Sequence, residues 1–227
     1  MKIAILGAMP EEITPLLEKL DYIQESYANN VFYFAKFKNH DLIIAYSKIG
    51  KVNSALSATL MIEKYGAEIL FFTGVAGSLN PNFKISDMVY GTKLLQHDID
   101  ISAFGHPYGY VPDTPIFINS DENLNQLALK VAKSLNLTIY PGIIASGDQF
   151  ICDDEKKKWI KGTFDADLAE MEGASVALVC HSLNTPFFIL RSVSDEAGTK
   201  AEFDFDKFMI SSAKISANFV LKMVENL

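Results

Sequence analysis

Residues 2–20 read KIAILGAMPEEITPLLEKL and place a short apolar run directly before a helical pattern. The apolar run, residues 2–8, has the composition and length of a buried β-strand. Residues 11–20 follow as a helix whose acidic first turn suits the positive end of the helix dipole. A strand that leads at once into a helix is the unit from which α/β domains are built.

The same alternation continues along the chain. Further strands are expected at residues 31–37, 41–47, 68–73, 87–95, 138–146 and 186–193, and further helices at 53–65, 123–135, 154–162, 172–182 and 205–224. Residues 74–78 are expected to form a loop after their strand. Residues 98–115 form a longer loop rich in Gly, Pro and aromatics, and loops of that length are usually functional or lie at an interface. With no repeat and no linker, residues 1–227 are predicted to form one α/β domain.

Composition excludes several classes of function. The 227 residues carry 28 acidic and 20 basic side chains, a net charge of −8, and Arg191 is the only arginine. Such a chain is a poor nucleic-acid binder and lacks the basic face of a membrane-surface protein. Its apolar runs fall short of the roughly 18 residues of a membrane span. The two cysteines and four histidines show no metal-ligand spacing, so we expect a cytoplasmic protein with reduced thiols and no metal.

Polar residues gather where the expected strands end, which is where open α/β sheets bind ligands. Glu12 has the ordinary interpretation of a solvated first-turn glutamate, and Asp195 that of a helix cap or turn residue. Glu172 favours a functional interpretation, since it begins a helix that is apolar on most sides and a buried carboxylate needs partners. Arg191, at the end of an apolar strand, is explained equally well by an ion pair with a buried acid.

Other signals are weaker when each is taken alone. The Gly74–Gly77 turn offers backbone N–H groups to a ligand, but such turns are common. Phe104 and Phe150 are core aromatics by default, and a stacking role becomes more plausible where they stand between polar residues on loops. The sequence contains neither a Gly-x-Gly-x-x-Gly fingerprint nor a phosphate-binding P-loop, so dinucleotide and nucleoside triphosphate sites are unsupported.

Taken together, these stretches resemble the 5′-methylthioadenosine/S-adenosylhomocysteine nucleosidases of the nucleoside phosphorylase superfamily. The resemblance runs over nearly the whole chain. It rests on seven stretches in the right order and spacing, residues 2–12, 48–51, 73–77, 103–105, 146–150, 169–173 and 191–195. It implies a three-layer α/β/α domain with a mixed central sheet, and hydrolysis of the bond between a purine and a 5′-substituted ribose.

The resemblance also implies roles for particular residues. Glu12 would activate the attacking water, and Asp195 would protonate N7 of adenine so that the base leaves neutral. This follows the two-carboxyl logic of glycoside hydrolysis. Residues implied for the ribose and adenine are Glu172 with the Met171 backbone at the ribose hydroxyls, Arg191 near the water and ribose, Phe150 stacked on adenine, and the Ile151 backbone at the adenine edge. The substrate-binding set also includes Val75 and Ser194.

A slot for the 5′ substituent would be apolar. The resemblance gives it Met9, Ile49 and Phe205 from the same chain and Ile101, Phe104 and His106 from a neighbouring subunit. A homodimer is therefore implied, which would give the long loop a purpose. The chemistry needs no cofactor.

Two positions depart from the common pattern of the family. Val75 stands where many members carry serine, and His106 stands where an aromatic such as tyrosine is common. With Val75, one hydroxyl near the ribose or water is missing, whereas His106 is expected to leave the 5′ pocket more polar. Beside methylthioadenosine, S-adenosylhomocysteine and 5′-deoxyadenosine, 6-amino-6-deoxyfutalosine, an intermediate of menaquinone biosynthesis, is a candidate substrate.

Two rival functions stay open at this point. A purine nucleoside phosphorylase would use phosphate in place of water, but phosphate is usually clamped by arginines, and the chain has one. A non-catalytic nucleoside-binding module would have no need of the water-activating base Glu12.

Overall fold

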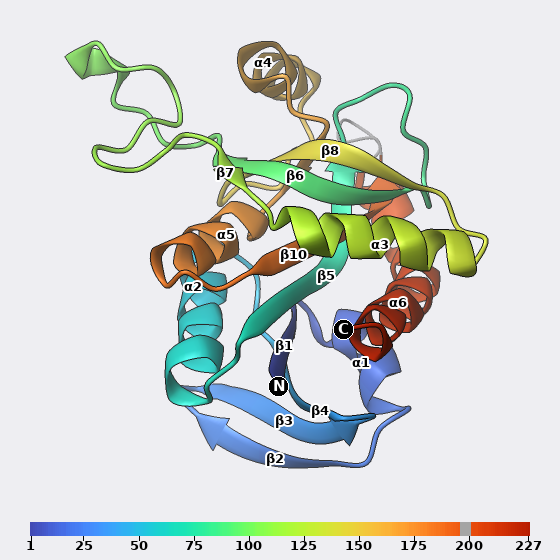
Figure 1. The fold of residues 1–227 in the computed structure, drawn as a ribbon. Coiled ribbons are helices and arrows are strands. Elements are labelled where there is room, and N and C mark those ends of the chain that lie inside the picture. The colour runs from blue at the N-terminus through green and yellow to red at the C-terminus, as the bar shows by residue number, and fades with distance from the viewer. Residues whose placement is uncertain (196–200) are drawn as a thin grey trace.

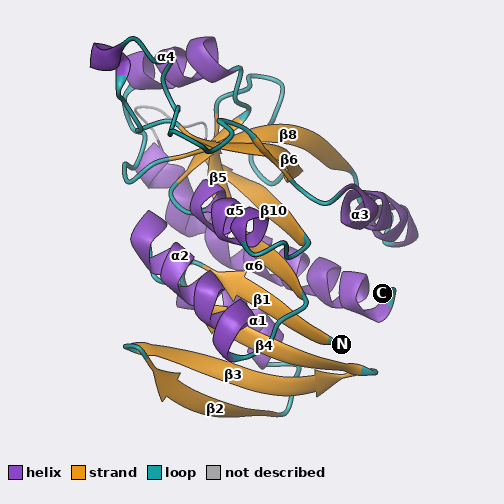
Figure 2. Cartoon of the chain, turned by 60° about the vertical axis from the view of Figure 1, so that its left-hand side comes forward, coloured by secondary structure: helices purple, strands orange, loops and turns teal. Residues whose placement is uncertain are grey.

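A mixed sheet between two layers of helices forms the body of the molecule (Figures 1 and 2). The computed structural model describes residues 1–195 and 201–227, apart from the side chains of residues 201–210. The strands are β1 (Lys2–Gly7), β2 (Tyr22–Tyr27), β3 (Asn30–Phe37), β4 (His40–Tyr46), β5 (Ile69–Ser78), β6 (Met88–Gln96), β7 (Ile118–Asn119), β8 (Ile139–Ser146), β9 (Leu168–Glu170) and β10 (Phe187–Asp195). The predicted three-layer α/β/α architecture is confirmed.

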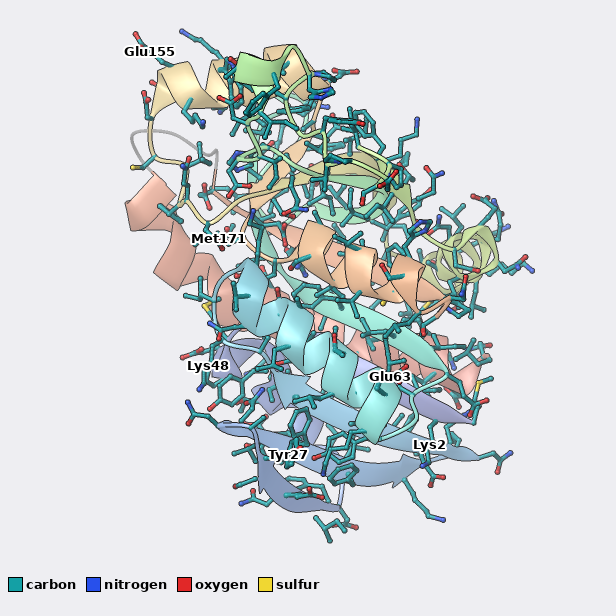
Figure 3. All side chains as sticks on the ribbon, turned by 90° about the vertical axis from the view of Figure 1, so that its left-hand side faces the viewer. Lys2, Tyr27, Lys48, Glu63, Glu155 and Met171 are labelled. Atoms are coloured by element: carbon teal, nitrogen blue, oxygen red, sulfur yellow. The ribbon has the colours of Figure 1, made fainter. Side chains whose placement is uncertain are left out.

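The helices cover both faces of the sheet. They are α1 (Pro10–Leu17), α2 (Lys51–Thr59) with its π-helical continuation η1 (Leu60–Lys64), the 3₁₀ turn η2 (Ser102–Phe104), α3 (Glu122–Ser134), α4 (Asp154–Phe164), α5 (Gly173–Ser182) and α6 (Ala201–Glu225). Alternation along β1 explains the two layers. Ala4 and Leu6 pack toward α2 and α5, whereas Ile3 and Ile5 pack toward α1, α3 and α6. In Figure 3, Met171 and Lys48 lie toward the beginning of α2 and Glu63 lies toward the end of η1.

The sheet closes on itself at one end. Its order is β10-β6-β8-β9-β5-β1-β4-β3-β2, with β7 on β6, and β10 also pairs with β5. Strands β10, β6, β8, β9 and β5 therefore form a ring. Within it β6, β8 and β9 run opposite to β5 and β10. Strand ends that would lie at opposite edges of a flat sheet are brought together by this closure.

Several sequence-based boundaries were wrong for physical reasons. The expected loop 74–78 is the second half of β5, because pairing with β10 continues across it. Strand β2 is exposed at every residue and so lacks the hydrophobic alternation that predicts strands. Strands β7 and β9 have two and three residues, too few to show a period. None of the helices in residues 1–195 and 201–227 has the length and hydropathy that a membrane span requires.

Candidate active site

A gap in the pairing along one edge of β5 defines the site. On this edge the described pairing with β1 ends at Phe72, and pairing with β9 begins at Gly77. Strand β1 stops at Gly7 because the chain turns there into α1. The backbone of Gly74, Val75 and Ala76 is thereby left to other partners, and the carboxylate of Glu12 takes the place that a neighbouring strand would occupy.

Glu12 is held there by three backbone N–H groups. Its Oε2 accepts hydrogen bonds from Ala8 at 2.6 Å and Met9 at 3.0 Å, and its Oε1 accepts one from Val75 at 3.1 Å. The first two bonds arise because Pro10 starts the helix and Glu12, two residues on, reaches back to its beginning. Burial raises the pKa of Glu12, although the charge of Arg191 and the three N–H groups oppose the rise. The solvated alternative is wrong, since Glu12 is only 3% exposed.

Arg191 and Glu170 form an ion pair behind the pocket. Glu170 Oε2 accepts hydrogen bonds from Arg191 Nη2 at 2.7 Å and Nε at 3.2 Å, and the guanidinium lies 4.0 Å from the centre of the Phe72 ring. Glu170 also accepts hydrogen bonds from the Gly173 N–H and the Ser146 hydroxyl. The ordinary interpretation of Arg191, a pair with a buried acid, therefore applies, and Arg191 does not line the pocket.

Glu172 faces the cavity from the entry to α5. Its Oε1 accepts a hydrogen bond from the Gly50 N–H at 2.8 Å. Burial, followed by the negative charge of Glu170, raises the pKa of Glu172 to about 8. The pocket thus contains a carboxyl group whose surroundings favour its protonated form.

Asp195 is placed by a bulge in β10. Val193 pairs with Ala76 and Asp195 pairs with Gly77, so Ser194 is the extra residue. Bulges of this kind redirect side chains next to active sites. The Ser194 hydroxyl lies 2.7 Å from Asp195 Oδ2 and 3.3 Å from the carbonyl oxygen of Ala76. Asp195 is 2% exposed, which is unlike a surface cap or turn residue.

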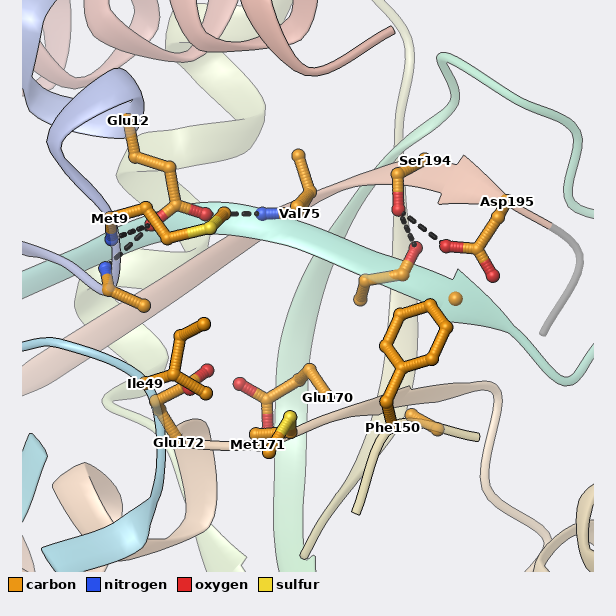
Figure 4. A pocket seen from close by; sticks show the side chains of 14 residues that line it. Met9, Glu12, Ile49, Val75, Phe150, Glu170, Met171, Glu172, Ser194 and Asp195 are labelled. Atoms are coloured by element: carbon orange, nitrogen blue, oxygen red, sulfur yellow. Dashed lines mark hydrogen bonds between the residues drawn. The ribbon is translucent and has the colours of Figure 1, made fainter. Parts of the chain in front are cut away.

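These side chains surround one cavity of about 490 Å³, counting its opening to solvent. Figure 4 shows Glu12 beside Val75 at one end and Asp195 beside Phe150 at the other. Predicted residues that line the cavity are Met9, Glu12, Ile49, Val75, Phe150, Met171, Glu172, Ser194 and Asp195; further lining residues are Ala8, Ala76, Gly77, Ala169 and Glu170. A smaller hollow continues from it to Gln149 and Ile151.

Some predicted residues lie apart from this cavity. Ile101, Phe104 and His106 belong to the long loop, which projects from the body of the molecule (Figure 1). Phe104 is 81% exposed and is therefore no core aromatic, and His106 stacks on Tyr110 with ring centres 4.5 Å apart. The side chain of Phe205 lies outside the described residues.

Glu170 was not predicted to have a role. It lies within a stretch that carried the resemblance. The sequence itself shows that Glu170 and Glu172 flank Met171 at the end of an apolar segment. Only the structure shows that one of them pairs with Arg191 and the other faces the cavity. Among the described residues, no group of three or more His, Cys, Asp or Glu side chains is arranged to hold a metal ion.

Comparison with known proteins agrees with this geometry. Residues 2–225 match the phosphorylase superfamily. The aminodeoxyfutalosine nucleosidase of Campylobacter jejuni is 67% identical over 228 residues, covering 100% of both chains. A crystal structure of the 5′-methylthioadenosine/S-adenosyl homocysteine nucleosidase of Campylobacter jejuni has a TM-score of 0.97 at 66% identity, again over 100% of both chains. A mutant Helicobacter pylori nucleosidase with 5′-methylthioadenosine in its active site has a TM-score of 0.97 at 47% identity, covering 100% of this chain and 99% of that one.

The chain belongs to the phosphorylase superfamily and, within it, to the 5′-methylthioadenosine/S-adenosylhomocysteine nucleosidase family. It is accordingly a nucleosidase, an enzyme that hydrolyses nucleosides. The family resemblance drawn from the seven stretches of sequence is confirmed.

Proposed function

We propose that this enzyme hydrolyses the N-glycosidic bond of 5′-substituted adenosines, with Glu12 as the base and Asp195 as the acid. The observation that carries the proposal is the buried Glu12 carboxylate, held by three N–H donors at one end of a cavity that Glu172 and Asp195 also line. Support also comes from the relatives, which are named for aminodeoxyfutalosine and for methylthioadenosine and S-adenosylhomocysteine.

Glu12 has the properties of a general base. Burial raises its pKa, which brings its proton affinity closer to that of an effective base near neutral pH. Its position is fixed by main-chain N–H groups of the turn between β1 and α1 and of β5, so orienting a water molecule costs little further entropy. The water loses a proton to Glu12 as its oxygen attacks C1′ of the ribose.

Asp195 would supply the proton for the departing base. A hydroxyl has one hydrogen, so Ser194 can donate to Ala76 or to Asp195, but not to both. When Asp195 is protonated, it can donate to Ser194, which in turn donates to Ala76. The neighbourhood can therefore stabilise the acid form. Transfer of this proton to N7 completes the cleavage. Overall, nucleoside plus water gives adenine plus the 5-substituted ribose. Exchange with solvent then removes the proton from Glu12 and restores one to Asp195.

Glu172, with the Met171 backbone, would bind the ribose hydroxyls. Hydrogen bonds donated by those hydroxyls favour the ionised carboxylate, so substrate binding would release the proton that the raised pKa retains. The resulting negative charge would stabilise an oxocarbenium-like sugar. Arg191 would act on this site through its charge, which lowers the pKa of both Glu12 and Glu172 from behind the pocket. Phe150 would stack on adenine, with the Ile151 backbone at its edge and Ser194 beside Asp195.

The 5′ group would lie against Met9, Ile49 and Val75, with Phe205 from α6, and a second copy of the chain would complete the slot with Ile101, Phe104 and His106. Two observations support a homodimer. Phe104 is exposed on a projecting loop, and Ile49, Val52 and Leu56 leave an exposed apolar stripe at the beginning of α2. The four-residue spacing of Val52 and Leu56 places both on one side of α2, and Ile49 lies just before the helix begins.

Aminodeoxyfutalosine is included among the proposed substrates, with methylthioadenosine, S-adenosylhomocysteine and 5′-deoxyadenosine. The 67% identical relative is named for it. His106 would add a polar group to the slot, which favours a 5′ substituent more polar than a methylthio group. Measuring kcat/KM on these nucleosides tests this extension, and no turnover of aminodeoxyfutalosine would remove it.

Phosphorolysis is disfavoured because the described residues that line the cavity offer no cation to phosphate. Its described lining contains neither lysine nor arginine, and the single arginine is committed to Glu170. The decisive experiment is incubation with methylthioadenosine in phosphate-free buffer, followed by an assay for adenine. Adenine released at a rate that added phosphate does not change supports hydrolysis. Strict dependence on phosphate indicates a phosphorylase, and a bound nucleoside that stays intact for hours indicates a sensor.

A further inference from the structure

Three charged residues outside the cavity form a closed ring of hydrogen bonds. Lys51 Nζ donates to Asp98 Oδ1 at 2.6 Å, and the Lys51 backbone N–H donates to Asp148 Oδ1 at 2.8 Å. The Asp148 backbone N–H donates to Asp98 Oδ2 at 2.9 Å and closes the ring. Gln96 Oε1 accepts a further bond from Lys51 Nζ at 3.0 Å. Each member is thus tied to the other two.

The ring joins three of the segments that carry the proposed substrate contacts. Lys51 directly follows Gly50, whose N–H donates a hydrogen bond to Glu172, and Gly50 follows Ile49, which lines the cavity. Asp148 lies two residues before Phe150. Asp98 stands at the start of the projecting loop that carries Phe104. These segments are remote in sequence, and α2, β6 and β8 supply one each.

The ring differs from an ordinary surface ion pair. The side chains of Lys51 and Asp98 are only 14% and 15% exposed. Burial opposes ionisation of Asp98, but the hydrogen bonds from Lys51 and the Asp148 N–H outweigh it and leave the pKa of Asp98 lowered. Exposed pairs contribute about 0–1 kcal/mol, whereas partly buried networks in a low dielectric are stronger and more rigid.

The backbone fits the ring closely. Gly50 has φ +99°, a conformation that other residues rarely adopt, and a Cβ there would lie 3.1 Å from Asp148 Oδ1. A Cβ at Gly147 would collide with the ring of His97. The segments therefore meet through glycines, so their separation is set by the hydrogen bonds between them.

We infer that Lys51 and Asp98 are positioning residues that fix the distance between Ile49 and Phe150. These are the side chains proposed to contact the 5′ group and the adenine of the nucleoside. The inference rests on the proposed nucleosidase function. The proposed base and acid are held by other contacts, Glu12 by α1 and β5 and Asp195 by β10. Loss of the ring should therefore weaken nucleoside binding far more than the chemical step.

The test compares Lys51→Met with wild type in the full-length protein, using methylthioadenosine as substrate. We expect KM to rise about 10- to 100-fold, the scale of an ångström-sized misplacement, with kcat changed much less. A variant that is merely unfolded in part would show the opposite, a lower kcat with an unchanged KM. Lys51→Arg should recover most of the affinity, because arginine can contact both Asp98 and Gln96.

Two further variants make the test specific. Asp98→Asn keeps an acceptor for the Asp148 N–H but loses the charge, and its effect on KM should not add to that of Lys51→Met, since both break one contact. The matched control is Lys64→Met, which removes the Lys64–Glu25 ion pair. This pair has the same 2.6 Å length, and Lys64 is the last residue of η1, far along the helix from Lys51. The control should leave KM and kcat unchanged.

The outcomes separate this inference from the proposed function. Active wild type with an unchanged KM in Lys51→Met overturns the positioning role, and so does a loss confined to kcat. Wild type that releases no adenine overturns the proposed function. The ring is then decided by equilibrium binding of methylthioadenosine, which an inactive wild type leaves intact and which should weaken in Lys51→Met but not in Lys64→Met.

Discussion

Arg191 is bound by Glu170 through two nitrogens, Nε at 3.2 Å and Nη2 at 2.7 Å from the same oxygen, Oε2. Both side chains are nearly inaccessible to solvent, at 1% and 3% exposed. The pair places the only positive charge of an arginine directly behind three carboxyl groups, Glu12, Glu170 and Glu172, and lowers the pKa of two of them. Arg191 is thus part of the electrostatic support of the pocket and not one of its walls.

Arg191→Met should destabilise the protein strongly. Removing one partner of a buried ion pair leaves an uncompensated charge, which typically costs about 3–5 kcal/mol. The free energy of unfolding in urea measures this cost. Arg191→Lys keeps the charge but not the two-nitrogen contact. Its free energy of unfolding should lie between those of wild type and Arg191→Met. A loss below about 1 kcal/mol in Arg191→Met would contradict the role given to the pair.

Glu12→Gln should abolish most turnover without unfolding the protein. An amide cannot take a proton from water, and loss of a general base typically lowers the rate about 10²–10⁴-fold. Adenine release measures the effect, and thermal unfolding checks the fold. The control is Glu11→Gln, the exposed acid on the same turn of α1, which should retain wild-type activity. Comparable activity in both variants would remove Glu12 as the base.

Asp195→Asn should separate binding from turnover. Without a proton donor, adenine must leave as an anion, so kcat is expected to fall about 10²–10⁴-fold. The amide oxygen can still accept a hydrogen bond from Ser194, so the pocket should keep its shape and its affinity for methylthioadenosine. Calorimetric titration of the intact nucleoside, beside an assay for adenine, checks both. Near-normal adenine release would show that another group is the acid.

Gly74→Ala in β5 should displace the carboxylate of Glu12. A Cβ at this position would lie 2.5 Å from Glu12 Oε1 and 3.1 Å from Arg191 Nη1. Overpacking of this kind costs about 1–3 kcal/mol, and kcat should fall because Glu12 has to move. Gly162→Ala on α4 is the control, since a Cβ there meets no described atom within 4 Å and alanine favours a helix by about 1 kcal/mol. Equal effects in unfolding and rate assays would contradict the close approach at Gly74.

Stability should decline as the pH rises through the neutral range. The pKa of Glu172 is about 8 in the fold, because of burial and the charge of Glu170, against an ordinary value of 4.5. Between these values the unfolded chain is ionised at this position and the folded chain is not, so ionisation favours unfolding by at most about 1.4 kcal/mol per pH unit. Glu12, with its raised pKa, acts in the same direction.

Glu172→Gln tests this dependence. It should flatten the decline and leave the variant more stable than wild type near pH 8, as measured by urea unfolding across the range. A wild-type protein whose stability rises between about pH 5 and 8 would contradict the raised pKa of Glu172.

Much of the fold was predictable because its signals are local. The helix at α1 followed from its acidic first turn, and β10 from the apolar run that ends at Arg191. The second half of β5 was missed since Gly74 and Gly77 resemble a turn, and only pairing with β10 makes them a strand. Short β9 and exposed β2 carry no period at all.

The site was predictable as a set of residues but not as an arrangement. The ends of the expected strands, at residues 146 and 195 among others, were placed at one end of a sheet whose strand order was unknown. In the structure β8 runs opposite to β5, and the closed ring of strands brings these ends together. The partner of Arg191 could not be chosen between Glu170 and Glu172 from spacing, because both are acids at the end of the same segment. Pairing across the ring decides it.

The contact between Glu12 and Val75 has an evolutionary consequence. Glu12 is bound by the N–H of Val75 and not by its side chain, so exchanging valine for serine at this position preserves the hydrogen bond that holds the carboxylate. If Glu12 is the base that we propose, substitutions here would alter which nucleosides fit while the geometry of bond cleavage stays unchanged. A lineage could therefore acquire a new substrate at position 75 without first passing through an inactive ancestor.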